Sequence, residues 1–351
     1  MVNNDNHRSN LASLQILRAL AAISVVYYHA APQPRFGSFG VDIFFVISGF
    51  VMGMLVINLQ SSGAFIIKRL ARIVPMYWTM TTIVLILTLI KPDILNSTQF
   101  NIINYLKSLF FIPYFKNNGL LQPMLGVGWT LNYEMFFYVV IWLSFSISRK
   151  FCIYLTSAII IFIYIIFGNW ISNELLNSFF GNSQIFEFIL GLIAFSAYNR
   201  ELVHKTMVIL NLFIILAIYF CMAYIEIHGI HYERIFLYGL FSFVIVLLAT
   251  SSEKQGLKID YLPANFLTTI GDASYSIYLT HTFVIDSVER IFFKNYTQFY
   301  TPMFALIFFY MLPSLIVGYI LYLTLDKPLY NFFKTRLMRL LSIVFLIRKK
   351  T

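Results

Sequence analysis

The amino-acid sequence predicts an all-α polytopic membrane protein, with about ten transmembrane helices in one bundle. Hydrophobic residues account for 59% of the 351-residue chain and charged residues for only 11%, a balance far from that of water-soluble domains. Apolar stretches of about 17–25 residues, the length that crosses a bilayer, recur along the whole chain. Short loops separate them, so we predict a single integral membrane domain.

The expected spans follow one another from the N-terminus to the C-terminus. They cover residues 11–31, 40–57, 74–90, 129–147, 151–168, 183–198, 207–225, 234–250, 272–293 and 303–325. We expect Asp326-Lys327-Pro328 to end the last span, because proline cannot continue a helix without loss of a hydrogen bond. The stretch 102–115 is short for a span and contains Lys107, which predicts an interfacial or re-entrant segment.

The charged residues predict the orientation of these spans. With ten spans, most of the 25 Lys and Arg residues lie on the side of the N-terminus, and basic loops stay on the cytoplasmic side of a membrane. We therefore predict a polar cytoplasmic tail at 1–10, a transmembrane domain at 11–328 and a basic cytoplasmic tail at 329–351. The partner implied by this composition is a lipid bilayer and not a nucleic acid. No metal-ligand motif is present, so no metal site is predicted.

The first two spans carry three ionisable groups that hydrocarbon disfavours, namely Arg18, His29 and Asp42. Each is a functional candidate for that reason. Each also has a structural alternative: Arg18 can reach lipid phosphates, His29 can be a hydrogen-bonded packing residue, and Asp42 can cap its helix. The hairpin returns Asp42 to the level where the first span ends. A carboxylate there could fix the tautomer of the His29 imidazole.

Further candidates lie just before the third span and within the fourth and ninth spans. Arg69 and Arg72 share one helix face by their spacing of three, and such a pair suits phosphate binding or simple cytoplasmic anchoring. Glu134 lies about one turn inside its span and should face a cavity or a partner. His281 lies mid-span, where we expect a buried hydrogen bond to a neighbouring hydroxyl group.

Five motifs in this order resemble a known family: RALAAISVVYYH, FGVDIFFVISGF, FIIKRLARIVPMYW, WTLNYEMFFY and GDASYSIYLTH. Together they resemble the bacterial integral-membrane acyltransferases (acyltransferase type 3), which include O-antigen and nodulation-factor acetylases. The resemblance extends from about Leu14 to Pro328. Its most specific signals are the Arg-x10-His spacing of Arg18 and His29 and the Arg-x-x-Arg pair Arg69 and Arg72.

The resemblance implies an enzyme of the bacterial cytoplasmic (inner) membrane. It implies no permanently bound cofactor, an acyl-CoA donor, commonly acetyl-CoA, and a carbohydrate acceptor such as O-antigen or a lipid-linked glycan. By this resemblance His29 is catalytic, Asp42 and Glu134 are supporting carboxylates, and Arg18, Arg69 and Arg72 lie near CoA. The histidine would act as general base or as an acyl carrier.

A transporter or flippase of a lipid-linked sugar is the alternative function. Buried His, Asp and Glu residues could form its proton relay. The sequence shows no evident internal repeat, a feature that many transporters have. Acyl transfer by purified protein separates the two functions.

Overall fold

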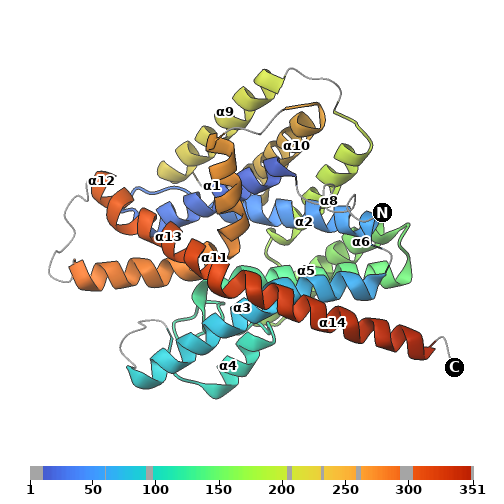
Figure 1. The fold of residues 1–351 in the computed structure, drawn as a ribbon, viewed down its shortest axis with the longest axis horizontal. Helices are drawn as coiled ribbons and strands as arrows, with labels where there is room; N and C mark the ends of the chain where they lie inside the picture. The colour runs from blue at the N-terminus through green and yellow to red at the C-terminus, as the bar shows by residue number, and fades with distance from the viewer. Residues whose placement is uncertain are drawn as a thin grey trace. The chain divides into compact units, whose positions relative to one another are not determined.

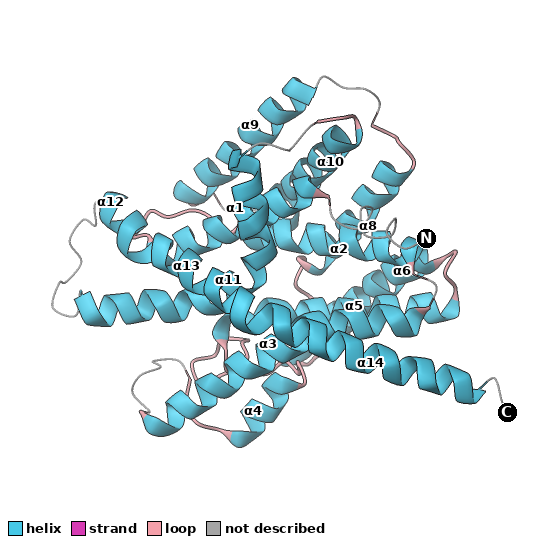
Figure 2. Ribbon diagram, in the orientation of Figure 1, coloured by secondary structure: helices cyan, strands magenta, loops and turns pink. Residues whose placement is uncertain are grey.

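The computed structural model describes the chain in seven segments. These are residues 11–59, 61–91, 98–203, 208–230, 233–257, 262–292 and 303–348. Their ordered elements are all helices (Figures 1 and 2), which confirms the all-α class. Contacts divide the chain into two units: Met1–Met54 with Phe186–Tyr322 (unit 1), and Leu55–Ile185 with Leu323–Thr351 (unit 2). The predicted tail 1–10 lies outside the described residues.

Unit 1 contains the helices that belong wholly or mainly to its two segments. They are α1 Ala12–Ala30, α2 Gly40–Asn58, α8 Ile185–Asn199, α9 Val208–Ile227, η4 Ile235–Gly239, α10 Leu240–Lys254, α11 Leu262–Phe292, α12 Met303–Ala305, η5 Leu306–Met311 and α13 Leu312–Leu321. The most extensive packing joins α1 to α11. Small residues of α1, including Ala19 and Ala22, meet Ala273 and Ile277 of α11 in a buried cluster. This packing positions α1, which ends just after His29, against α11.

Glycines bring α2 and α8 into close contact within unit 1. A Cβ atom on Gly49 would lie 2.2 Å from the Phe188 carbonyl oxygen, and one on Gly191 would lie 2.2 Å from the Val46 carbonyl oxygen. Both positions therefore need glycine, as at other close helix crossings in membranes. The crossing holds the start of α8 against α2, where several ionisable groups meet.

Unit 2 is assembled around α3. Its helices are α3 Ser62–Ile90, α4 Ile102–Leu109, η2 Gly126–Gly128, α5 Trp129–Ile147, α6 Cys152–Ile165, η3 Ile166–Trp170, α7 Glu174–Phe180, most of η6 Tyr322–Asp326, and α14 Lys327–Arg348. The Ser61 hydroxyl accepts the Ala64 N–H and begins α3 as an N-cap. Helices α4, α5 and α14 all pack on α3.

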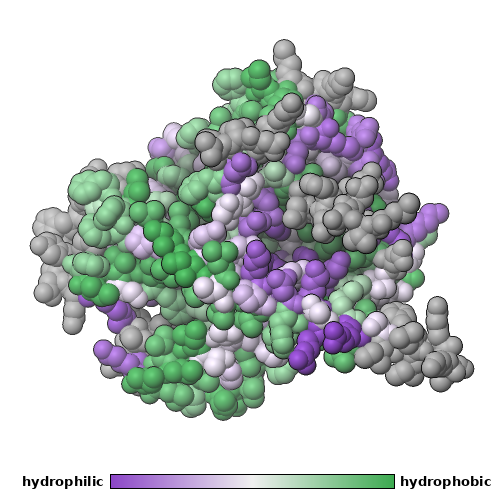
Figure 3. All heavy atoms as spheres, viewed as in Figure 1, coloured by the Kyte–Doolittle hydropathy of each residue, from purple (hydrophilic) through white to green (hydrophobic). Residues whose placement is uncertain are grey.

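Seven helices in the described residues are long and apolar enough to cross a membrane. The other three predicted spans also form helices, namely α1, α11 and the shorter apolar segment Cys152–Gly168. A multi-pass membrane protein is therefore the class, while ten spans stays a prediction. Figure 3 shows hydrophobic side chains over the exposed surface around α13, where Ile316 is 48% exposed and Ile320 51% exposed. Lipid-facing helices expose such side chains.

Two short segments test the sequence predictions directly. Helix α4 has eight residues and rises about 12 Å, so it is too short to cross a hydrocarbon core of about 30 Å. The prediction that Asp326-Lys327-Pro328 ends the last span relied on a break in the helix, and that break is absent, because α14 continues from Lys327 to Arg348. The π-helical turn η6 precedes Pro328. Such a turn interrupts the usual hydrogen-bond ladder and so accommodates a residue without an N–H.

Candidate functional site

Two histidines from different helices meet in unit 1. His29 lies in the last turn of α1 and His281 lies within α11, and their ring centroids are 5.0 Å apart. The packing of α1 on α11 brings them together over a large distance in sequence. His29 is exposed, whereas His281 is fully buried. The exposed His29 ring thus lies next to a second, buried imidazole.

The hydrogen bonds of His281 define its tautomer. Its Nδ1 atom lies 2.8 Å from the Tyr278 carbonyl oxygen and 3.2 Å from that of Ile277. Carbonyl oxygens only accept, so Nδ1 carries a proton, and in the neutral ring Nε2 then carries the lone pair. Nε2 is buried and has no hydrogen-bond partner among the described residues. The expected buried hydrogen bond is confirmed, but its acceptor is backbone and not a hydroxyl group.

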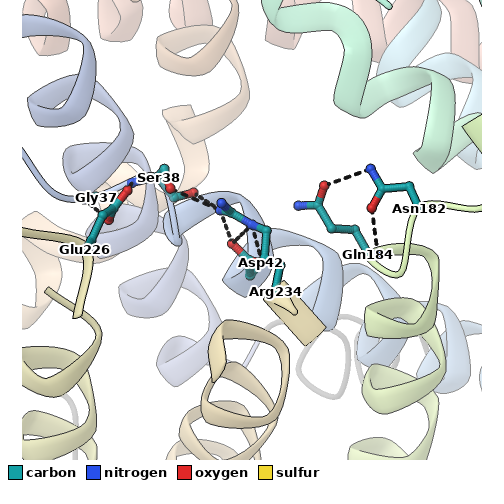
Figure 4. A network of polar contacts seen from close by, with 7 residues as sticks. All are labelled: Gly37, Ser38, Asp42, Asn182, Gln184, Glu226 and Arg234. Carbon is teal, nitrogen blue, oxygen red and sulfur yellow. Dashed lines mark hydrogen bonds and ion pairs between the residues drawn. The ribbon is translucent and has the colours of Figure 1, made fainter. Parts of the chain in front are cut away.

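Asp42 lies in the first turn of α2 and binds Arg234, which directly precedes η4. The Arg234 Nε atom donates to Oδ1 of Asp42 at 2.8 Å and to Oδ2 at 3.1 Å, and Nη2 donates to Oδ2 at 2.5 Å (Figure 4). Asp42 is fully buried and Arg234 is 31% exposed. Asp42 therefore has a guanidinium partner, and the described residues show no direct hydrogen bond between Asp42 and His29. No sequence motif identified Arg234, although its position at the start of an apolar span was a signal.

The loop between His29 and Asp42 is held by two charged side chains. The Gly37 and Ser38 N–H groups donate to the Glu226 carboxylate at 2.7 and 3.2 Å, and Arg234 Nη2 donates to the Ser38 carbonyl at 2.9 Å (Figure 4). Gly37 has φ +114°, and a Cβ atom there would lie 2.1 Å from the Ser24 carbonyl oxygen. Glycine is thus required at this turn.

A second carboxyl group, Glu187 of α8, is fully buried close to Asp42 and Arg234. Its oxygens accept no hydrogen bond from an N–H or O–H donor of the described residues, but its carboxyl group lies within hydrogen-bond reach of the Asp42 carboxylate. Arg234 is therefore shared electrostatically by two buried acidic groups. Glu187 lies inside the predicted span 183–198, so the general signal of an ionisable residue in a span could have identified it.

A separate polar group forms in unit 2. The Tyr138 hydroxyl donates a short hydrogen bond to Glu134, one turn earlier in α5. The Arg69 guanidinium of α3 lies 6.0 Å from the centre of the Tyr138 ring, a distance at which a cation interacts with an aromatic face. The buried Arg69 Nε has no hydrogen-bond partner in the described part of the chain. Tyr138 thus connects Arg69 with Glu134.

Arg72 has a different partner from Arg69. It donates to Asp326 at 3.1 Å, and Asp326 is only 2% exposed. The ion pair joins α3 to η6. Arg18 lies on α1 in unit 1, with Nη1 3.5 Å from the Gln15 side-chain oxygen. His29 and Asp42 thus belong to unit 1, and Arg69, Arg72 and Glu134 belong to unit 2. The predicted meeting of Glu134 with His29 stays a prediction.

Comparison with known proteins gives consistent matches. A family model of the acyltransferase 3 type, described as an acyltransferase domain, matches residues 11–323. The exopolysaccharide production protein ExoZ of Rhizobium meliloti (strain 1021) is 30% identical over 312 residues, which cover 86% of this chain and 93% of ExoZ. No solved structure matches this chain significantly.

Two longer relatives are named as O-acetyltransferases. The O-acetyltransferase OatA of Staphylococcus aureus (strain NCTC 8325 / PS 47) is 27% identical over 351 residues, which cover 91% of this chain and 57% of OatA. The peptidoglycan O-acetyltransferase OatA of Listeria monocytogenes is 32% identical over 153 residues, or 39% of this chain and 24% of that protein. The match therefore spans only part of each of these two relatives.

Proposed function

We propose that this chain, which belongs to the acyltransferase 3 family, transfers an acetyl group to a hydroxyl of a polysaccharide. The names of its relatives refer to exopolysaccharide production and to O-acetyl transfer, which supports a hydroxyl acceptor on a glycan. We take acetyl-CoA as the donor and an exported carbohydrate such as O-antigen as the acceptor. The observation that carries the proposal is the family match over residues 11–323.

His29 is the proposed general base. It is exposed at the end of α1, so an acceptor hydroxyl can reach it. One ring nitrogen takes the proton of the sugar hydroxyl while the oxygen attacks the thioester carbonyl carbon. The carbon–sulfur bond breaks, and the imidazolium returns its proton to the departing CoA thiolate. General-base catalysis of this kind contributes about 10²- to 10⁴-fold in rate.

His281 is proposed as the positioning residue of His29. Its Nε2 lone pair is buried and the centroid of its ring is 5.0 Å from that of His29. A hydrogen bond from a His29 N–H to this nitrogen would leave the other His29 nitrogen unprotonated, as a general base requires. The same contact would stabilise the positive charge that His29 gains in the transition state.

Asp42 supports the site through the loop that follows His29. Its carboxylate fixes Arg234, and Arg234 in turn fixes Ser38. The turn at Gly37 is therefore held at both sides, which orients the end of α1. Asp42 is thus a positioning residue in this mechanism. Glu134, bound by Tyr138, is proposed to contribute to acceptor binding.

The arginines are proposed to bind the phosphates of acyl-CoA. The Arg69 Nε has no hydrogen-bond partner among the described residues, so Arg69 has donor capacity for an anion. Arg72 is paired with Asp326, which reduces its net attraction for phosphate. Arg69 should therefore contribute more to donor affinity than Arg72. Arg18 is proposed as a third basic contact.

Purified protein in detergent, supplied with acetyl-CoA and a surface polysaccharide, tests the proposal. We expect release of free CoA thiol together with new acetyl esters on the glycan by mass spectrometry. A flippase of a lipid-linked sugar would give neither product, because transport needs two compartments. Absence of ester formation by protein that binds acetyl-CoA would contradict the proposal.

A further inference from the structure

The segment between α3 and α5 lines a half-open cavity of about 320 Å³ that the reaction above does not use. Its walls come from residues before, within and after α4. They include Thr98, Gln99, Asn104, Tyr114, Lys116 and Asn117, and we call this cavity the Lys116 pocket. Its size lies at the small end of the range of about 300–1,000 Å³ found for ligand sites. One or two sugar rings fit such a space.

The pocket contains a buried cation that has no counter-ion among the described residues. Lys116 is 7% exposed, and its Nζ atom donates to the Thr98 hydroxyl at 2.9 Å and to the Met124 carbonyl at 3.3 Å. An ammonium group has three N–H donors, so one remains for a ligand. No carboxylate in the described segments forms an ion pair with Lys116. A buried charge of this kind favours an anion that compensates it.

Burial lowers the pKa of Lys116 to about 8. Lys116 is therefore mostly charged at pH 7 and loses its charge as the pH rises above about 8. A bound anion would stabilise the charged form and raise this pKa. Binding of an anion at this lysine should thus be strongest at neutral pH.

The other walls of the pocket suit hydroxyl groups and a sugar ring. Asn117 donates its side-chain N–H to Gln99 at 2.8 Å, which leaves the Gln99 amide nitrogen and the Asn117 amide oxygen as donor and acceptor. Phe100 also lines the pocket and is 51% exposed. Amide side chains and an exposed aromatic face together match the hydroxyls and the C–H surface of a carbohydrate.

We propose that the Lys116 pocket binds an acidic sugar residue, with the carboxylate of the sugar on Lys116 and its hydroxyls on the amide side chains. This inference rests on the proposed function, because it makes the acceptor an acidic polysaccharide. A small inorganic anion matches the site less well. It would compensate Lys116 but leave the amides and most of the cavity without a partner.

Equilibrium binding of two oligosaccharides to the purified protein, without any donor, tests this proposal. The probes are a glucuronic acid trisaccharide and a glucose trisaccharide of the same linkage. We expect the acidic probe to bind at least about tenfold more tightly at pH 7, because its carboxylate can form a charge-assisted hydrogen bond with Lys116. The preference should fall towards unity at pH 9.5 in the unmodified protein, and affinity for glucose should stay constant.

Lys116→Met removes the charge and keeps most of the volume, so it should abolish the preference for the acidic probe at every pH. Lys91→Met, at an exposed lysine of the same unit, is the matched control and should retain it. Equal binding of both probes by the unmodified protein would overturn the proposal. A preference retained by folded Lys116→Met would do the same.

Two further readouts separate the alternatives. Inorganic phosphate that displaces the acidic trisaccharide as effectively as free glucuronate would show a general anion site and overturn the sugar assignment. Because these assays need no acetyl-CoA, they are independent of catalysis. Acidic-sugar binding without any acetyl transfer would refute the proposed function and leave the pocket assigned.

Discussion

The polar groups of the two units are organised differently. In unit 1, Arg234 binds fully buried Asp42 through three contacts, and the exposed His29 lies beside an uncharged His281. In unit 2, Arg72 donates to Asp326, and Arg69 retains a buried N–H that has no hydrogen-bond partner among the described residues. Unit 1 thus holds its charges in a fixed array and leaves a histidine accessible. Unit 2 retains cationic capacity, which suits an anionic substrate.

Removal of the accessible histidine should have the largest effect on activity. His29→Ala should lower acetyl transfer by about 10²- to 10⁴-fold, because the general base is lost. Acetyl-CoA binding and thermal unfolding should stay near the values of the unmodified protein. Transfer by His29→Ala at a normal rate would exclude both the general-base and the acyl-histidine mechanisms.

Removal of the Arg234 guanidinium from unit 1 should have the largest effect on stability. Arg234→Met leaves Asp42 buried and unpaired, which we expect to cost about 3–5 kcal/mol in unfolding free energy. The matched variant in unit 2, Arg72→Met, should cost less because the Arg72 side chain is 27% exposed and its ion pair with Asp326 is therefore partly screened by its surroundings. Thermal unfolding followed by tryptophan fluorescence measures both. The double variant Asp42→Asn with Arg234→Met should recover part of the loss, and no recovery would argue against a direct pairing effect.

Two substitutions of His281 distinguish a positioning role of this residue from simple packing. His281→Phe removes the Nε2 acceptor and should lower kcat by about tenfold or more with little change in KM, consistent with the loss of a positioning hydrogen bond. His281→Gln supplies a side-chain oxygen acceptor and should recover part of the rate. Equal rates for the two variants would assign His281 to packing alone. The pH dependence of kcat should also shift in His281→Phe, since the environment of His29 changes.

The smallest expected effect concerns the two arginines of unit 2. Arg69→Ala should raise the KM for acetyl-CoA about tenfold, because a charge-assisted contact to phosphate is lost. Arg72→Ala should weaken donor binding less and destabilise the protein more, since it removes the guanidinium that pairs with the buried Asp326. Steady-state kinetics and thermal unfolding of both variants measure the two effects. If both variants bind acetyl-CoA as tightly as the unmodified protein, Arg69 and Arg72 serve only to anchor the helix on the cytoplasmic side.

Local sequence was sufficient for the elements and for part of the site. Hydropathy predicted ten apolar spans that all fall on helices of the structure, because burial in lipid requires a long apolar run that is visible in one segment. The Arg-x-x-Arg spacing placed Arg69 and Arg72 on one helix. The position of His29 near the end of its predicted span placed it at the end of α1. The helix that continues through Pro328 was missed, because a π-helical turn leaves no clear local signature.

Partners were decided by the tertiary structure alone. Asp42 and Arg234 are 192 residues apart in sequence, and nothing in either segment identifies the other. The same holds for His29 and His281, which meet only because α1 packs on α11. Lys116 looks like an ordinary loop lysine until the fold buries it against Thr98 and Met124. Hydropathy is a property of one segment, whereas compensation of a charge depends on which distant segment the packing brings within about 3 Å of it.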